Sequence, residues 1–110
     1  MSISSINSGL SGMQAFERAL DVTANNVANV STNGFQPQQA SFQTIPGGGV
    51  NATASAPATP QTAAAASAPS GTDLVKETVD SLQYKYGFDL SAQVVKTANE
   101  TLGTLVNIKA

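Results

Sequence analysis

The stretch T-A-N-N-V-A-N-V-S-T-N-G-F, residues Thr23–Phe35, begins with a helical pattern and ends with a turn signal. Asn25, Asn26 and Asn29 are three and four residues apart, so their amides share one face of a helix. Asparagine is a poor helix former because its side chain competes for backbone hydrogen bonds. Three asparagines on one face therefore indicate a packing or pairing role.

The end of this stretch predicts where the helix stops. Asn33 and Gly34 are the two residue types that best tolerate left-handed backbone angles. On local chemistry alone, the asparagines are explained more simply by a helix end that is rich in cap and turn residues. Whether the asparagines serve packing or only end the helix depends on the rest of the chain.

Upstream, apolar residues recur every three or four positions and predict an amphipathic helix from about Ser4 to Val30 with a coiled-coil-like seam. Small residues beside the seam, Gly9, Gly12, Ala15 and Ala19, allow a neighbouring helix to come close. The seam consists of Ile3, Ile6, Leu10, Met13, Leu20 and Val27.

The middle of the chain, 36–72, predicts an extended or disordered linker. Pro37 bars helix continuation, and from Pro46 onward the composition is nearly all Ala, Pro, Ser, Thr and Gly. So few large apolar groups do not offset the entropy of ordering. Phe42 and Ile45 leave three possibilities open: docking on a helix, a short strand, or neither.

A second long helix is predicted from Asp73 to Ile108, with Thr72 or Asp73 as its N-cap. Its apolar residues recur mostly every fourth position, which gives a narrow stripe with little else in the chain to cover it. The stripe consists of Val75, Val79, Leu82, Tyr86, Leu90, Val94, Ala98, Leu102 and Leu105.

Together these segments predict an all-α fold in which two long helices form an antiparallel coiled-coil-like hairpin. The expected organisation is an N-terminal helix and Asn-Gly turn over 1–35, an Ala/Pro/Ser/Gly linker over 36–72 and a C-terminal helix over 73–110. The uncovered stripe argues that other subunits complete the packing.

The composition argues against catalytic activity and metal binding. It contains no cysteine and no histidine, which removes thiol chemistry, the usual general base and the commonest metal ligand. The carboxylates Asp73, Glu77, Asp80 and Asp89 follow one another along a helix, which favours a charged face over a cation site. We therefore expect no enzyme activity, no cofactor and no metal.

Charge and hydropathy also limit the partners. A net charge of −2 gives no case for binding nucleic acid, and no apolar run is long enough for membrane insertion. No Lys or Arg precedes Arg18, so a cleavable secretory signal is not expected.

The motif N-N-V-A-N-V-S-T-N-G-F, residues 25–35, resembles the N-terminal signature of the bacterial flagellar rod and hook (axial) proteins. D-L-V-K-E-T-V-D-S-L at 73–82 and V-V-K-T-A-N-E-T-L-G-T-L-V-N-I at 94–108 resemble the C-terminal helix of the same family. The short middle resembles the shortest, proximal-rod-type members. Because both ends match, we interpret the asparagines as setting register in an assembly interface.

The resemblance implies a structural subunit of the basal-body rod, or a divergent paralogue of one, that assembles through its terminal helices into a torque-transmitting tube. It also implies export through the flagellar type III apparatus, a final place in the periplasmic rod, and homo- or hetero-oligomers with other basal-body proteins. The residues expected in the assembly interface are Ile3, Ile6, Leu10, Met13, Leu20, Asn25, Asn26, Val27, Asn29, Val79, Leu82, Leu102 and Leu105.

A departure from the family, together with the truncated middle of the chain, motivates an alternative. Where the family commonly has A-Q-R-A-Y-E, this chain has Y-K-Y-G-F-D over Tyr84–Asp89. The alternative is a non-axial helical interaction protein, regulatory or export-associated, that has kept rod-type terminal helices.

Overall fold

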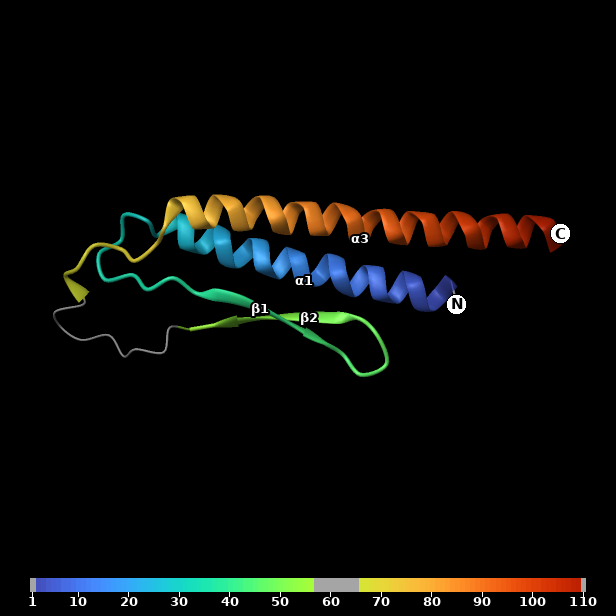
Figure 1. The fold of residues 1–110 in the computed structure, drawn as a ribbon, viewed down its shortest axis with the longest axis horizontal. Helices are drawn as coiled ribbons and strands as arrows, with labels where there is room; N and C mark the ends of the chain where they lie inside the picture. The colour runs from blue at the N-terminus through green and yellow to red at the C-terminus, as the bar shows by residue number, and fades with distance from the viewer. Residues whose placement is uncertain (1, 57–65, 110) are drawn as a thin grey trace.

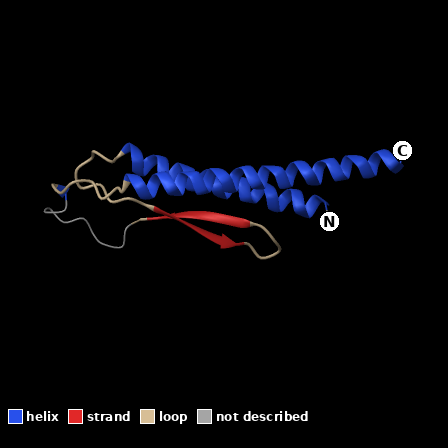
Figure 2. Cartoon of the chain, turned by 45° about the horizontal axis from the view of Figure 1, so that its top comes forward, coloured by secondary structure: helices blue, strands red, loops and turns tan. Residues whose placement is uncertain are grey.

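A computed structural model describes residues 2–56 and 66–109, in the order α1 (Ser2–Ala28), β1 (Gln39–Thr44), β2 (Val50–Ser55) and α3 (Leu74–Lys109). The two helices run antiparallel, and α1 lies between α3 and a β-hairpin formed by the two strands (Figures 1 and 2). The principal extents are 69 × 25 × 14 Å. The radius of gyration, 18.7 Å, exceeds the roughly 13 Å of a compact domain of this length, so the chain is a rod-shaped molecule.

The two predicted helices are present, with ends that differ by about two residues from expectation. Helix α1 ends at Ala28, and i→i+3 backbone bonds carry the chain through the next residues to Gly34, whose φ is +75°. Helix α3 begins at Leu74. Asp73 is its N-cap, because its Oδ1 accepts the backbone N–H groups of Val75 and Lys76 at 3.0 and 3.3 Å.

The all-α prediction is wrong, because the predicted linker contains an antiparallel β-hairpin. Strand β1 pairs with β2 in the register Thr44↔Val50 through Gln39↔Ser55. Three consecutive glycines, Gly47 to Gly49, take φ values of +92° to +110° and turn the chain between the strands. Two of the three possibilities left open for Phe42 are observed together, because it lies in strand β1 and its ring packs against Phe16 of α1. Residues 57–65 of the predicted linker lie outside the described residues.

The hairpin forms because α1 holds it in place. Val50 donates its N–H to the Ser11 hydroxyl at 3.1 Å, and the Arg18 guanidinium donates to the Asn51 side chain at 3.1 Å and to the Ala52 carbonyl at 3.5 Å. Ala52 is buried against the helix. The prediction assumed that only large apolar residues could order this segment. Instead, small side chains and hydrogen bonds to α1 hold it in place.

The buried apolar core is made almost entirely of small residues. Within the described parts of the chain, the buried apolar side chains are those of Ala15, Ala19, Val22, Ala52 and Ala98. Large aliphatic side chains lie outside this core, in contrast with an ordinary globular domain. The buried apolar side chains are therefore mostly small, and the large apolar side chains lie mostly on the surface of the molecule.

Candidate assembly interface

The contact between α1 and α3 depends on residues with little or no side chain. A Cβ added at Gly9 would lie 2.6 Å from Val95 Cγ2, and one added at Gly12 would lie 2.6 Å from Ser91 Oγ. Ala15 and Ala19 are also buried. The expectation that small residues admit a close neighbouring helix is confirmed at Gly9 and Gly12, and the neighbour is the chain's own α3.

The two helices meet in a single register along their shared length. Each step toward the C-terminus of α1 is matched, to within one residue, by a step toward the N-terminus of α3. The contacts that define the register are Gly9 with Val95, Gly12 with Ser91, Phe16 with Gly87, Thr23 with Ser81, and Asn26 with Glu77.

Asn26 is the polar centre of this contact. Its side chain is 1% exposed and uses both ends of the amide. Nδ2 donates to the Gln38 carbonyl at 2.8 Å and to Glu77 Oε1 at 2.9 Å, while Oδ1 accepts the Gln38 N–H at 2.9 Å. Its own backbone carbonyl accepts the Thr72 hydroxyl at 3.0 Å. One side chain thus joins α1, the segment that leads into β1, and the first turns of α3.

The other two asparagines of the cluster make local contacts. Asn29 Nδ2 donates to the Asn25 carbonyl at 2.9 Å and to Asn25 Oδ1 at 3.2 Å, and Asn29 Oδ1 accepts the Thr32 hydroxyl. Asn25 is exposed and Asn29 is partly exposed. Both therefore remain on the outer surface of the single chain, and their place in an assembly interface stays a prediction.

Glu77 is a buried residue that the sequence analysis assigned to a charged surface. It is 2% exposed, and its Oε2 has no hydrogen-bond partner among the described residues. The sequence signal for its burial was weak, because Glu77 belongs to a run of carboxylates that otherwise faces solvent. Its position opposite Asn26 follows only from the register of the two helices.

An aromatic cluster joins all three layers of the molecule. The Phe16 ring lies 5.2 Å from Phe42 and 6.5 Å from Tyr84, and Phe42 lies 5.7 Å from Tyr84, measured between centroids. A Cβ at Gly87 would lie 2.5 Å from the Phe16 ring. Burial, with a smaller contribution from Asp80, raises the pKa of the Tyr84 hydroxyl above its usual value. Phe16 and Gly87 were not among the expected interface residues.

The predicted seam of α1 does not face α3. Ile3 is 66% exposed, and Leu10 and Val27 are also exposed, while Ile6, Met13 and Leu20 are partly exposed. The residues that touch α3, such as Gly9, Gly12 and Asn26, precede seam residues by one position. A shift of one residue rotates the face by about 100°, so the seam lies beside the helix contact, and three of its six residues are exposed to solvent.

Helix α3 likewise turns its bulky apolar residues outward. At about 100° per residue, the residues Val75 to Leu90 of the stripe lie on the side opposite the positions that face α1. Leu82 is 64% exposed, and Val79 and Leu105 are also exposed, whereas Leu102 is partly covered. We call this exposed set, Val75, Val79, Leu82, Tyr86 and Leu90, the outer stripe.

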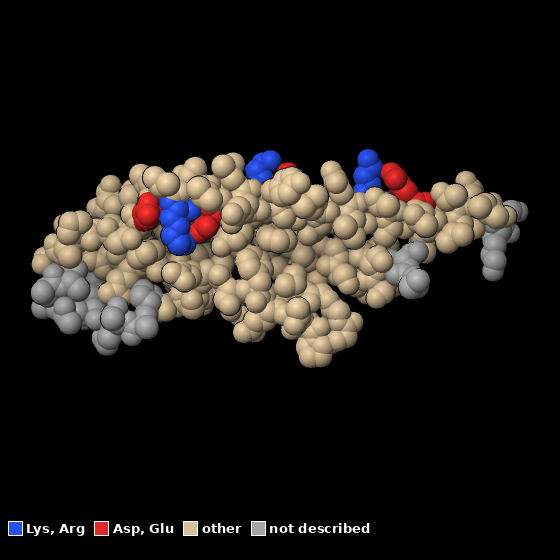
Figure 3. All heavy atoms as spheres, in the orientation of Figure 1, with Lys and Arg blue, Asp and Glu red and all other residues tan. Residues whose placement is uncertain are grey.

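Charged side chains are sparse and lie mainly along α3 (Figure 3). Lys76–Asp80, Lys85–Asp89 and Lys96–Glu100 form i,i+4 pairs at 2.7, 3.3 and 4.0 Å. Its hydrogen bond to Asp80 raises the pKa of the Lys76 ammonium. Exposed pairs of this kind contribute little stability, and none of them lies on the outer stripe.

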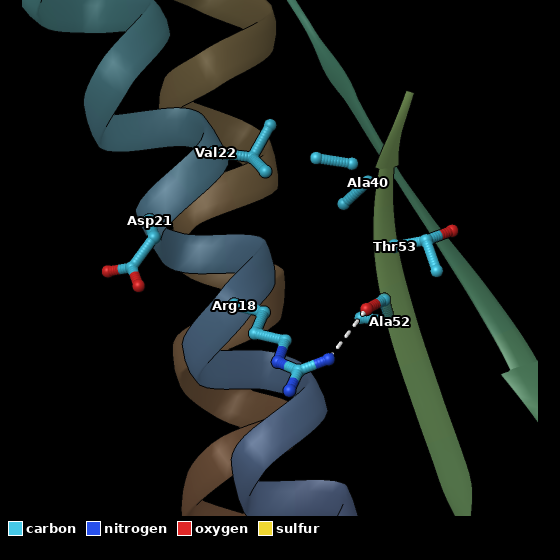
Figure 4. A pocket seen from close by; sticks show the side chains of 7 residues that line it. Arg18, Asp21, Val22, Ala40, Ala52 and Thr53 are labelled. Carbon is cyan, nitrogen blue, oxygen red and sulfur yellow. Dashed lines mark hydrogen bonds between the residues drawn. The ribbon is translucent and has the colours of Figure 1, made fainter. Parts of the chain in front are cut away.

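A groove lies between α1 and the hairpin. It has a volume of about 390 Å³, and Val22 and Ala40 point into it while Asp21 points away (Figure 4). Across the described residues there is no group of three or more Asp, Glu, His or Cys side chains placed to hold a metal ion. Over the same residues, neither helix is long and apolar enough to cross a membrane.

The fold and its surfaces define a class of protein: a helical hairpin with a docked β-hairpin, small residues inside and large apolar residues outside. Comparison with known families gives two matches, one at each end of the chain. Residues 6–36 match the family described as flagella basal body rod protein, and residues 66–108 match the flagellar basal body rod FlgEFG protein C-terminal family. Together the two matches span about two thirds of the chain, and the chain belongs to the flagellar rod and hook family.

Individual relatives share only short segments with this chain. The flagellar hook protein FlgE of Helicobacter mustelae is 60% identical over 38 residues, which is 34% of this chain and 8% of the relative. The flagellar basal-body rod protein FlgG of Bacillus subtilis is 49% identical over 49 residues, which is 40% of this chain and 19% of the relative. The resemblance found in the sequence is therefore confirmed at the level of the family.

Proposed function

We propose that this chain is a structural subunit of the flagellar rod that assembles through its two helices into a torque-transmitting axial tube. The observation that carries the proposal is the inverted packing of the single chain. Gly9 and Gly12 let α1 and α3 approach closely, while three residues of the α1 seam and the outer stripe of α3 remain exposed.

The exposed side chains supply a driving force for assembly. Burying one large aliphatic side chain contributes about 1.5–3 kcal/mol relative to leaving it in water. Five exposed members of the outer stripe and three of the α1 seam are therefore enough to support association even after its entropic cost. A stiff tube needs interlocked helices and no reaction chemistry, so we assign the chain no enzymatic activity.

Within this proposal the expected interface residues have two tasks. The large apolar ones, including Leu10, Val79 and Leu82, contact neighbouring subunits. Asn26 holds α1 in register with α3 and thereby fixes how the two apolar surfaces are presented together.

A place in the rod rather than the hook is supported by the short middle of the chain. Only residues 37–65 separate the two family matches. The neighbours in this proposal are other axial proteins of the basal body, in homo- or hetero-oligomers. Delivery follows the family's flagellar type III export route, which ends in the periplasmic rod. No observation favours the alternative of a non-axial interaction protein.

A genetic experiment tests the proposal. Deleting the gene should abolish rod completion and motility, and wild-type protein should restore both. Leu82→Asp should fail to restore them, because it places a charge on the outer stripe. Asn99→Asp is the matched control, since it adds the same charge at an exposed position on another face of α3. An intact, rotating basal body in the deletion strain, with the protein retained in the cytoplasm, would contradict the proposal.

A further inference from the structure

The turn that follows α1 contains a reactive pair of residues. Asn33 is exposed, and it precedes Gly34, which has no side chain to hinder its amide nitrogen. In an Asn-Gly sequence the glycine nitrogen can attack the asparagine side-chain carbonyl, and no other residue pair presents less steric hindrance to that attack. The proposed axial function makes no use of this chemistry.

A hydrogen bond in the folded chain hinders this reaction. Gly34 is buried, and its N–H donates to the Ala68 carbonyl at 2.7 Å. A second backbone bond runs the other way, from the Gly71 N–H to the Phe35 carbonyl at 3.0 Å. Residues 66–72, which we call the docking segment, thus hold the nucleophilic nitrogen in a short hydrogen bond.

The docking segment is itself tied to the Asn26 centre. The Thr72 hydroxyl donates to the Asn26 carbonyl at 3.0 Å and accepts from the Ser70 hydroxyl at 3.2 Å. Release of Gly34 therefore requires a local opening that also strains the junction of α1 and α3. Such an opening is populated to an extent set by its free energy.

We propose that Asn33 is a self-modification site that the docking segment keeps closed in the folded chain and that opens when the segment undocks. In the reaction, the Gly34 nitrogen loses its proton and bonds to the Asn33 side-chain carbonyl carbon, and the amide nitrogen leaves as ammonia. Water then opens the resulting succinimide ring at either carbonyl. The net change is asparagine plus water to aspartate or isoaspartate plus ammonia.

The isoaspartate product of the modification would make undocking permanent. An isoaspartate linkage adds one carbon atom to the backbone immediately before Gly34. That displaces the Gly34 N–H from the Ala68 carbonyl and removes the backbone bridge to the docking segment. Chains that remain undocked would thus lose the ability to dock, whereas docked chains are protected. This inference stands independently of the proposed rod function.

Mass spectrometry of the full chain tests the inference. Chymotryptic cleavage after Leu20 and Phe35 releases 21–35, which contains Asn25, Asn26 and Asn29 as internal references that no glycine follows. The conversion of Asn33 is followed over time in the native protein and in the same protein unfolded in urea. We expect conversion at least about tenfold slower in the native protein, because opening must break several hydrogen bonds.

Variants test separately the hydrogen bonds of the docking segment and the reactivity of the Gly34 nitrogen. Thr72→Val removes the bond to the Asn26 carbonyl and should speed native conversion about fivefold, whereas the control Thr53→Val, at an exposed strand position, should not. In urea, Gly34→Ala should slow conversion, since a Cβ hinders the attacking nitrogen. Equal rates in native and unfolded protein, no conversion in urea, or no effect of Thr72→Val would each overturn the inference.

Discussion

Asn26 and Glu77, which are 51 positions apart in the sequence, meet inside the molecule through a 2.9 Å hydrogen bond from Nδ2 to Oε1. Both side chains are almost completely buried. Because the Asn26 side chain also bonds to the backbone N–H and carbonyl of Gln38, this pair links the end of α1 to the beginning of α3 and to the entry of the hairpin.

Replacing Asn26 should be strongly destabilising. Asn26→Ala leaves Glu77 and the Gln38 backbone without their partners, and unsatisfied buried groups cost about 1–3 kcal/mol each. We expect the free energy of unfolding in urea to fall by about 3 kcal/mol or more. Asn25→Ala, at an exposed neighbouring position, should change it by about 0.5 kcal/mol or less.

A double replacement distinguishes a specific pair from general packing. Asn26→Leu combined with Glu77→Leu removes both buried polar partners at once and should be less destabilising than the sum of the single changes. Additive losses in the urea titration would show that the two side chains act separately.

We predict that the packing of α1 against α3 requires glycine at position 87, although glycine normally destabilises a helix interior. In a helix interior, Gly→Ala normally stabilises by about 1 kcal/mol. At Gly87 the new methyl group would lie 2.5 Å from the Phe16 ring, and overpacking of this kind costs about 1–3 kcal/mol. We expect Gly87→Ala to lower the free energy of unfolding.

Gly103 provides the matched control, because a Cβ there meets nothing within 4 Å. Gly103→Ala should raise the helix content and the stability measured by circular dichroism. A gain of equal size for Gly87→Ala would contradict the observed contact with Phe16.

Stability should decrease at alkaline pH. The pKa of Tyr84 is raised above 10.0 in the folded chain by burial, so the unfolded chain loses this proton first as pH rises. The resulting contribution to stability is complete below pH 10 and is lost as pH rises from there through the folded pKa. The raised pKa of Lys76 acts in the same direction, but its exposure makes the effect small.

Urea titrations at neutral pH and above pH 10 test this dependence. Tyr84→Phe should reduce the alkaline loss, and the exposed Tyr86→Phe should leave it intact. The interpretation fails if the two variants lose equal stability on raising the pH.

The two helices were predictable because their apolar residues repeat at a helical spacing and because Asp73 and Gly34 provide local cap and turn chemistry. The hairpin was not, since Ala52 becomes buried only when α1 supplies a surface for it. The α1–α3 contact was foreseen in part from Gly9 and Gly12. Its polar and aromatic members, Glu77 and Phe16, depend on the register of distant residues, which no local pattern contains.

The central claim, that the bulky apolar surface of the free chain becomes buried in an axial assembly, is best tested at Leu82. The chain has no cysteine, so Leu82→Cys introduces a single thiol. Its reaction rate with a maleimide is compared in the purified chain and in isolated basal bodies that contain it. We predict rapid labelling of the free chain and strong protection in the assembly; equally rapid labelling in both would contradict the account.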